Sequence, residues 1–72
     1  MTGPPIANNI RRLRFEADEM TQEELGRRIG MTRQTIAAIV QRKYAPSLEA
    51  AFRIARVFGQ PLEAVFQWVD ES

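Results

Sequence analysis

The chain has 72 residues, enough for one small domain, and its apolar fraction of 44% argues against wholesale disorder. It has no cysteine, no histidine and no apolar run near the ~20 residues of a membrane helix, which excludes disulfides, thiolate metal sites and membrane spans. The net charge is only +1, yet residues 1–43 hold eight Lys/Arg against five Asp/Glu, and no acid lies between Glu24 and Glu49. That basic block suits a polyanion if the fold gathers it on one face; otherwise it is a solvated surface.

The first predicted helix follows residues 1–5, a segment without the features of a secretory signal that we expect to be flexible. Apolar residues recur at helical spacing along this helix, at Ile6, Ile10, Leu13 and Ala17. Asn8 and Asn9 are the two candidates for its N-cap, because a short amide side chain can accept a hydrogen bond from an unpaired N–H of the first turn.

Residues 21–41 predict two helices joined by a tight turn. Thr21 and Glu24 form a capping box, in which the Thr21 hydroxyl accepts from the Glu24 amide and the Glu24 carboxylate reaches back to Thr21. Gly30 ends the second helix, since glycine enters the left-handed conformation without strain, and Thr32 caps the third. Gly26 lets a neighbouring backbone approach closely. The residues expected to face inward around the three-residue turn are Leu25, Ile29, Met31, Ile36 and Ile39.

Two further short helices follow a break at residues 44–46. Ser47 caps the fourth, in which Glu49 and Arg53 form an i,i+4 pair, and Gly59 ends it. Its predicted apolar stripe consists of Leu48, Ala51, Ala55 and Phe58, widened by Ile54. A short fifth helix is predicted from Pro61 through Leu62, Val65 and Phe66. Residues 67–72 are too short for another helix and form either a short strand or a frayed end.

The outer face of the third helix carries the candidate chemistry. With Ile36, Ile39 and Val40 buried, the residues left outside are Arg33, Gln34, Ala37, Ala38 and Gln41. Arginine and glutamine make bidentate contacts with guanine and adenine edges, and alanine permits close approach to a thymine methyl. Gln22 at the start of the preceding helix suits a phosphate, and Lys43 and Tyr44 can hold the DNA backbone on the other side.

The sequence resembles a known family at these residues. The run TQEELGRRIGMTRQTIAAI at 21–39 is similar to the helix-turn-helix of Cro and phage repressors, a family also called xenobiotic-response-element regulators. The resemblance covers roughly residues 8–68, and the end of that span is similar to short stand-alone members such as the cytolysin-operon repressor. The other matching segments are 43–49, 58–59, 61–63 and 66–68.

The resemblance implies a compact five-helix, lambda-repressor-like fold that binds operator DNA as a symmetric homodimer. Short members pair a C-terminal strand with N-terminal residues, so residues 6–8 and 67–72 are candidates for a short two-stranded sheet added to an otherwise all-α domain. The resemblance also implies roles by position: Gln22 contacts phosphate, Thr32, Arg33, Gln34 and Ala38 face bases, and Thr35, Gln41 and Lys43 approach the backbone.

Two positions depart from the family pattern. The family usually has Glu at the position of Val40, paired with an arginine that matches Arg14. An isolated buried charge is costly, so we expect Arg14 to turn to solvent or to bond backbone carbonyls at the end of the third helix. The family often has Gly or Asn at the position of Arg42, where a left-handed conformation strains arginine by ~1 kcal/mol. A different turn is therefore expected there, with Arg42 adding a phosphate contact in exchange.

These observations predict a sequence-specific double-stranded DNA-binding transcription regulator, a dimeric repressor that lays its third helix in the major groove. It is expected in the cytoplasm, on the nucleoid when bound to DNA. The alternative is a protein-interaction module on the same fold, an antitoxin or adaptor, which the loss of the usual acid at Val40 would fit. Phe66 and Trp68 either close the core or anchor a partner subunit, with Trp68 the better interface candidate. Neither catalysis nor a cofactor or metal is expected, because no histidine, cysteine or ligand cluster is present.

Overall fold

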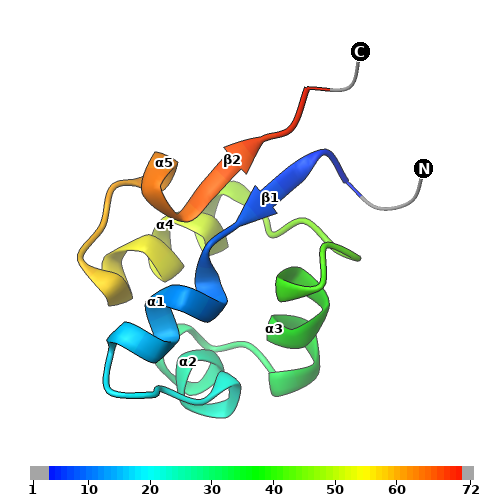
Figure 1. Ribbon diagram of the computed structural model, residues 1–72. Coiled ribbons are helices and arrows are strands. Elements are labelled where there is room, and N and C mark those ends of the chain that lie inside the picture. Colours follow the sequence, from blue (N-terminus) through cyan, green and yellow to red (C-terminus); the bar gives the residue numbers. More distant parts are fainter. Residues whose placement is uncertain (1–3, 71–72) are drawn as a thin grey trace.

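The computed structural model describes residues 4–70 as five helices and two short strands (Figure 1). The helices are α1 (Ile10–Glu16), α2 (Gln22–Ile29), α3 (Arg33–Val40), α4 (Leu48–Phe58) and α5 (Leu62–Val65), and the strands are β1 (Ile6–Asn8) and β2 (Phe66–Trp68). The predicted fold, five helices with a small sheet from the termini, is confirmed. Residues 1–3 of the segment expected to be flexible, and residues 71–72 of the predicted tail, lie outside the described residues.

The two strands pair antiparallel, with Ile6 opposite Trp68 and Asn8 opposite Phe66. The placement of Ile6 in the first helix was therefore wrong, as was that of Phe66 in the fifth. The Asn9 N–H donates to the carbonyl of Val65 over 2.9 Å, so the backbone before Ile10 continues to pair with the chain that leads into β2. Asparagine also offers the backbone local alternatives to a helix, which favours a helix start after it.

The start of α1 uses both asparagines, in different ways. Asn9 occupies the N-cap position but its side chain makes no capping bond; Asn8 instead accepts the Ile10 N–H on Oδ1 at 3.1 Å. The Asn9 amide group donates to the carbonyl of Ala64 over 3.0 Å and so ties α1 to α5. The Asn9 amide therefore connects α1 with α5, whereas the Asn8 oxygen makes a local bond at the start of α1.

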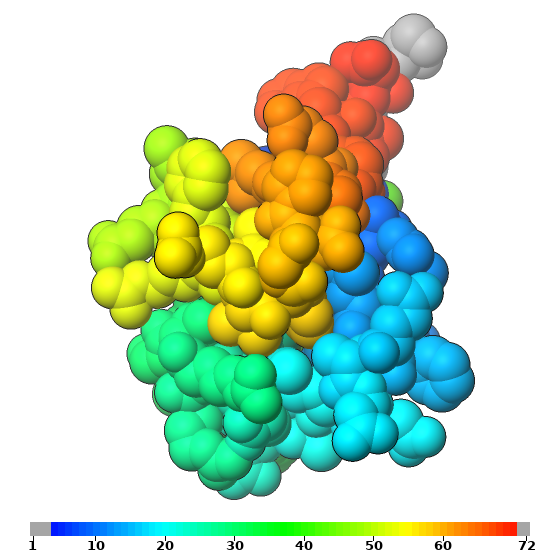
Figure 2. Space-filling view, turned by 90° about the vertical axis from the view of Figure 1, so that its left-hand side faces the viewer, coloured from blue at the N-terminus to red at the C-terminus, as the bar shows by residue number. Residues whose placement is uncertain are grey.

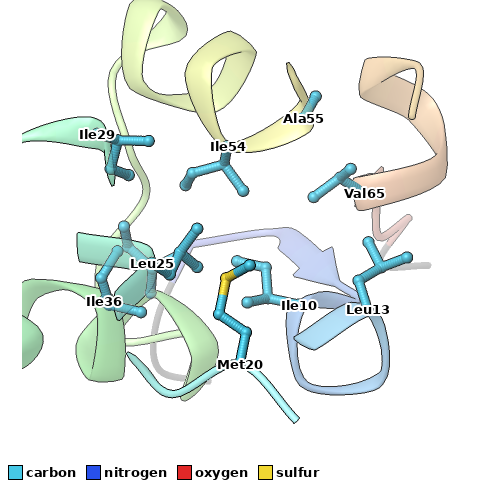
Figure 3. Packing of buried hydrophobic residues seen from close by; sticks show 10 residues of the cluster. Ile10, Leu13, Met20, Leu25, Ile29, Ile36, Ile54, Ala55 and Val65 are labelled. Carbon is cyan, nitrogen blue, oxygen red and sulfur yellow. The ribbon is translucent and has the colours of Figure 1, made fainter. Parts of the chain in front are cut away.

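The core lies where the five helices meet, and Figure 3 shows its side chains pointing to a common centre. The side chains with almost no solvent exposure are Ile10, Leu25, Ile36, Ile39, Ile54 and Val65. Leu48, predicted for the buried stripe of α4, is 68% exposed. It lies in the first turn of α4 at the rim of an open apolar cavity, while Ala51, Ile54 and Ala55 further along the helix carry the burial.

Candidate nucleic-acid interface

The angle between α2 and α3 is fixed by a three-residue turn, residues 30–32, as predicted. Gly30 ends α2 with φ 76°, and the Thr32 hydroxyl accepts the Thr35 N–H at 3.1 Å to start α3. A Cβ on Gly26 would lie 2.4 Å from the Met31 carbonyl oxygen. The turn thus packs directly on the backbone of α2, which holds α3 in a defined direction.

The N-terminus of α2 is capped by Thr21, whose hydroxyl accepts the Glu24 N–H at 3.0 Å. The other half of the predicted capping box is wrong, because the Glu24 carboxylate does not reach back to Thr21. It accepts instead from Arg27 and from Arg28 Nε, the latter at 2.7 Å. Two arginines within one or two turns outcompete a single backbone N–H for the carboxylate, since charge-assisted hydrogen bonds are the stronger kind.

The candidate base-reading residues form the first turns of α3, which lies on the outside of the molecule (Figure 1). Thr32, Arg33 and Gln34 are exposed, while Ala37 and Ala38 are half-buried on the flank of the helix. The Thr32 and Thr35 hydroxyls lie 2.9 Å apart, so each already has one partner within the helix. The structure brings these residues together on one short helix end, with arginine and glutamine as its longest side chains.

The candidate phosphate-binding residues lie at both ends of this unit. Gln22 is half-buried at the first position of α2, and Thr35 is half-buried in α3. The remaining four are consecutive and exposed just beyond α3: Gln41, Arg42, Lys43 and Tyr44.

The cations of the basic block divide into two groups. Glu24 pairs with Arg27 and Arg28, and elsewhere Arg12–Glu16 and Arg53–Glu49 form exposed pairs. Within residues 4–70, Arg33, Arg42 and Lys43 form no ion pair. The cations of the acid-free stretch that lack an ion pair therefore sit at the two ends of α3, while Arg27 and Arg28 share the one carboxylate of Glu24.

The turn after α3 keeps the left-handed conformation despite its arginine, so the expectation of a different turn was wrong. Arg42 has φ 63°. Its N–H donates to Ile39 O at 3.0 Å, and the Lys43 N–H donates to Ala38 O at 2.9 Å. These two bonds define a Schellman cap with arginine where glycine is usual. The hydrogen bonds that end the helix thus hold Arg42 in a strained backbone conformation.

Arg14 neither turns to solvent nor bonds the end of the third helix, the two arrangements expected for it. It is half-buried, and its Nη1 donates to a backbone carbonyl, but that of Met20 before α2, at 2.9 Å, not one at the end of α3. The loop at 17–20 folds back on α1 through left-handed Asp18 and Glu19, which carries the Met20 carbonyl to the guanidinium. Burial, and secondarily the charge of Arg11, lowers the pKa of Arg14 below its ordinary value. Its Nε is buried without a partner.

An apolar surface lies beside the terminal sheet. Trp68 is 69% exposed, Phe52 and Leu48 are exposed on one face of α4, and Phe66 is half-buried. An open cavity of about 300 Å³ there is lined by Ile6, Pro46, Leu48, Ala51, Leu62 and Phe66. Sequence reasoning missed Leu48 and Phe52 as surface residues, although their i,i+4 spacing on α4 was a usable signal.

The described part of the chain lacks two other kinds of feature, a metal-binding cluster and a membrane-spanning helix. Residues 4–70 contain no group of three or more acidic, histidine or cysteine side chains that could hold a metal ion. None of the helices within that range is long and apolar enough to cross a membrane.

Known proteins resemble the chain over most of its length. A family model described as Helix-turn-helix matches residues 10–65, from the first residue of α1 to the last residue of α5. An uncharacterized HTH-type transcriptional regulator of Methanocaldococcus jannaschii is 48% identical over 53 residues, 74% of this chain and 80% of the relative. YgzD of Bacillus subtilis, also named as an uncharacterized HTH-type transcriptional regulator, is 42% identical over 67 residues, 93% of this chain and 98% of the relative. Both strands lie outside the matched span.

Proposed function

The chain belongs to the helix-turn-helix family of DNA-binding transcription regulators, and on that premise we propose that it is a dimeric repressor of operator DNA. Each subunit lays the N-terminal part of α3 in a major groove. The observation that carries the proposal is the exposed end of α3, rigidly fixed on α2 and flanked by uncompensated cations.

Base reading is assigned to the first turns of α3. Arg33 and Gln34 supply the long side chains that can bond guanine and adenine edges bidentately, each good pair contributing ~1–3 kcal/mol of discrimination. The short side chains of Ala37 and Ala38 on the flank of α3 let the helix approach the bases. The complete proposed base-contacting set is Thr32, Arg33, Gln34, Ala37 and Ala38.

Backbone contacts are assigned to residues on both sides of that helix. Lys43 and Arg42 supply charge, and the polar neighbours supply hydrogen bonds that set the register of the protein on the duplex. The complete proposed phosphate-contacting set is Gln22, Thr35, Gln41, Arg42, Lys43 and Tyr44.

Dimerisation is assigned to the terminal sheet, through Phe66 and Trp68. The indole of Trp68 is large and exposed, and Trp68 pairs with Ile6, which lines the apolar cavity; such a side chain suits burial against a second subunit. The sheet projects from the helical body (Figure 1), and the red C-terminal segment that contains β2 stands out from the helices in Figure 2, which leaves β2 accessible to a partner. Two copies related by a two-fold axis would read half-sites about 34 Å apart. In the same proposal, the bound dimer represses transcription by excluding polymerase from the DNA. The protein is then located in the cytoplasm, on the nucleoid when bound.

The test is selection of binders from a randomised duplex pool, followed by titration of the enriched sequences at several salt concentrations. A palindromic consensus with a steep salt dependence supports the dimeric repressor, because neutralised phosphates release their counterions. Recovery of sequences no better than non-specific DNA contradicts operator binding. The same fold would then be assigned to protein interaction, as an antitoxin or adaptor.

A further inference from the structure

The last turn of α3 is held from outside the helix by strand β1. Asn8 Nδ2 donates to the carbonyl oxygen of Ile39 over 3.0 Å, between residues 31 positions apart. The same oxygen accepts the Arg42 N–H at 3.0 Å, the bond that closes the left-handed cap. The Ile39 carbonyl therefore receives one donor from its own helix cap and one from the terminal sheet.

This turn is one that needs support. A non-glycine residue in the left-handed region persists only where its surroundings over-determine it, and Arg42 is such a residue. Among the side-chain hydrogen bonds of residues 4–70, that of Asn8 alone joins the last turn of α3 to another element. The orientation of the Asn8 amide is itself fixed, since its Oδ1 accepts the Ile10 N–H at 3.1 Å and Nδ2 must then point toward Ile39.

We propose that Asn8 is a positioning residue of the DNA interface. Through the Ile39 carbonyl it holds the turn that aims Arg42 and Lys43, the two cations at the end of α3, toward the DNA backbone. Asn8 lies opposite Phe66 in the sheet, so β1 pairs with the proposed dimer strand and bonds α3 through the Asn8 side chain. The effect on DNA rests on the proposed function; the effect on the turn does not.

The neighbouring Asn9 is a matched control. Its Nδ2 also donates to a backbone carbonyl over 3.0 Å, but the acceptor is Ala64 in α5, away from α3. Both asparagines are half-buried and stand next to each other at the start of α1. Aspartate at either position therefore removes the same kind of donor bond, and the two variants differ in which element is released.

The experiment compares Asn8→Asp with Asn9→Asp, each of which removes the amide donor and keeps a side-chain acceptor. Asn8→Ala and Asn9→Ala repeat the comparison without adding charge, with the difference that alanine at Asn8 also removes the acceptor of the Ile10 N–H. Hydrogen exchange of the Arg42 and Lys43 amides is measured in the free protein, together with affinity for a selected duplex. The Asn8 variants are expected to speed exchange at both amides and to weaken DNA binding about fivefold, the order of one net hydrogen bond, with Asn9 variants within twofold of the parent.

Equal effects of the two positions on these amides, or unchanged exchange in the Asn8 variants, would overturn the proposal. Faster exchange with unchanged affinity would overturn the positioning role toward DNA. If the parent protein binds no duplex, the proposed function fails, and the exchange comparison still decides whether Asn8 holds the turn.

Discussion

Arg42 ends α3 in the same left-handed conformation with which Gly59 ends α4, at φ 63° and 65°. Both caps close with the same pair of backbone hydrogen bonds, between 2.9 and 3.1 Å long. Glycine adopts this conformation freely, whereas arginine there loses ~1–2 kcal/mol. An exposed cation thus stands at the end of α3, at a position where glycine would make the protein more stable.

Replacing this arginine separates stability from binding. Arg42→Gly is expected to raise the free energy of unfolding by about 1 kcal/mol, because the strain is relieved. The same change is expected to weaken DNA binding and to lower the slope of log affinity against log salt by about one for each bound subunit, because each subunit loses one phosphate contact. Urea denaturation and titrations at several salt concentrations measure the two effects.

The control for that experiment is Gly59→Arg. A Cβ at Gly59 meets nothing within 4 Å, so the substitution adds the backbone strain without a clash. It is expected to lower stability by about 1 kcal/mol and to leave DNA affinity unchanged. An Arg42→Gly protein that is less stable than the parent would contradict the strain argument.

Base and phosphate contacts respond differently to alanine. Arg33→Ala and Gln34→Ala are expected to lose ~1–3 kcal/mol on the selected sequence and to relax the preference at one base pair each. Lys43→Ala is expected to weaken binding to all DNA sequences by about the same factor. Arg56→Ala is the control, since it removes an exposed cation from α4. Competition binding with single-base variants of the duplex measures the pattern, and a uniform loss in Arg33→Ala would contradict base reading.

The close approach at Gly26 predicts a steric limit. Gly26→Val is expected to destabilise the protein by about 2 kcal/mol or more, because the new side chain meets the Met31 backbone and cannot be relieved by a rotamer change. Arg27→Val places the same residue on the exposed face of α2 and is expected to have a smaller effect. Thermal denaturation compares the two, and equal losses would show that the α2–α3 contact is not the cause.

The dimer proposal is tested at Trp68, the only tryptophan of the chain. Trp68→Ser is expected to weaken self-association about 30-fold, the equivalent of ~2 kcal/mol, and to leave the monomer folded because the side chain is 69% exposed. Phe15→Ser is the matched control, since Phe15 is equally exposed but belongs to α1. Sedimentation over a concentration series measures the effect. Tryptophan emission that stays unchanged on dilution would contradict burial of Trp68 between subunits.

The sequence by itself determined the helix-turn-helix unit. Thr21, Gly30 and Thr32 act on backbone groups within a few residues, so their capping roles and the length of the turn could be predicted from local chemistry. The inward-facing residues followed from helical periodicity for the same reason. Arg33, Gln34, Ala37 and Ala38 follow from that pattern too, because an outer face is defined once the inner one is known, whereas the base-facing role of Thr32 came from the family resemblance.

Tertiary structure alone decided the features that depend on distant partners. Ile6 is part of a strand because it pairs with Trp68, 62 positions away. Local sequence could not predict this, because a three-residue strand is too short to show a periodicity of its own. Arg14 bonds Met20 because the loop at 17–20 folds back to meet it. Arg42 stays left-handed because backbone hydrogen bonds, with Asn8 from β1 on the same carbonyl, outweigh its local preference. Arg14 and Met20 are six positions apart, whereas in the other two cases a contact between distant segments adds to or overrides the few kcal/mol that sequence-local preferences control.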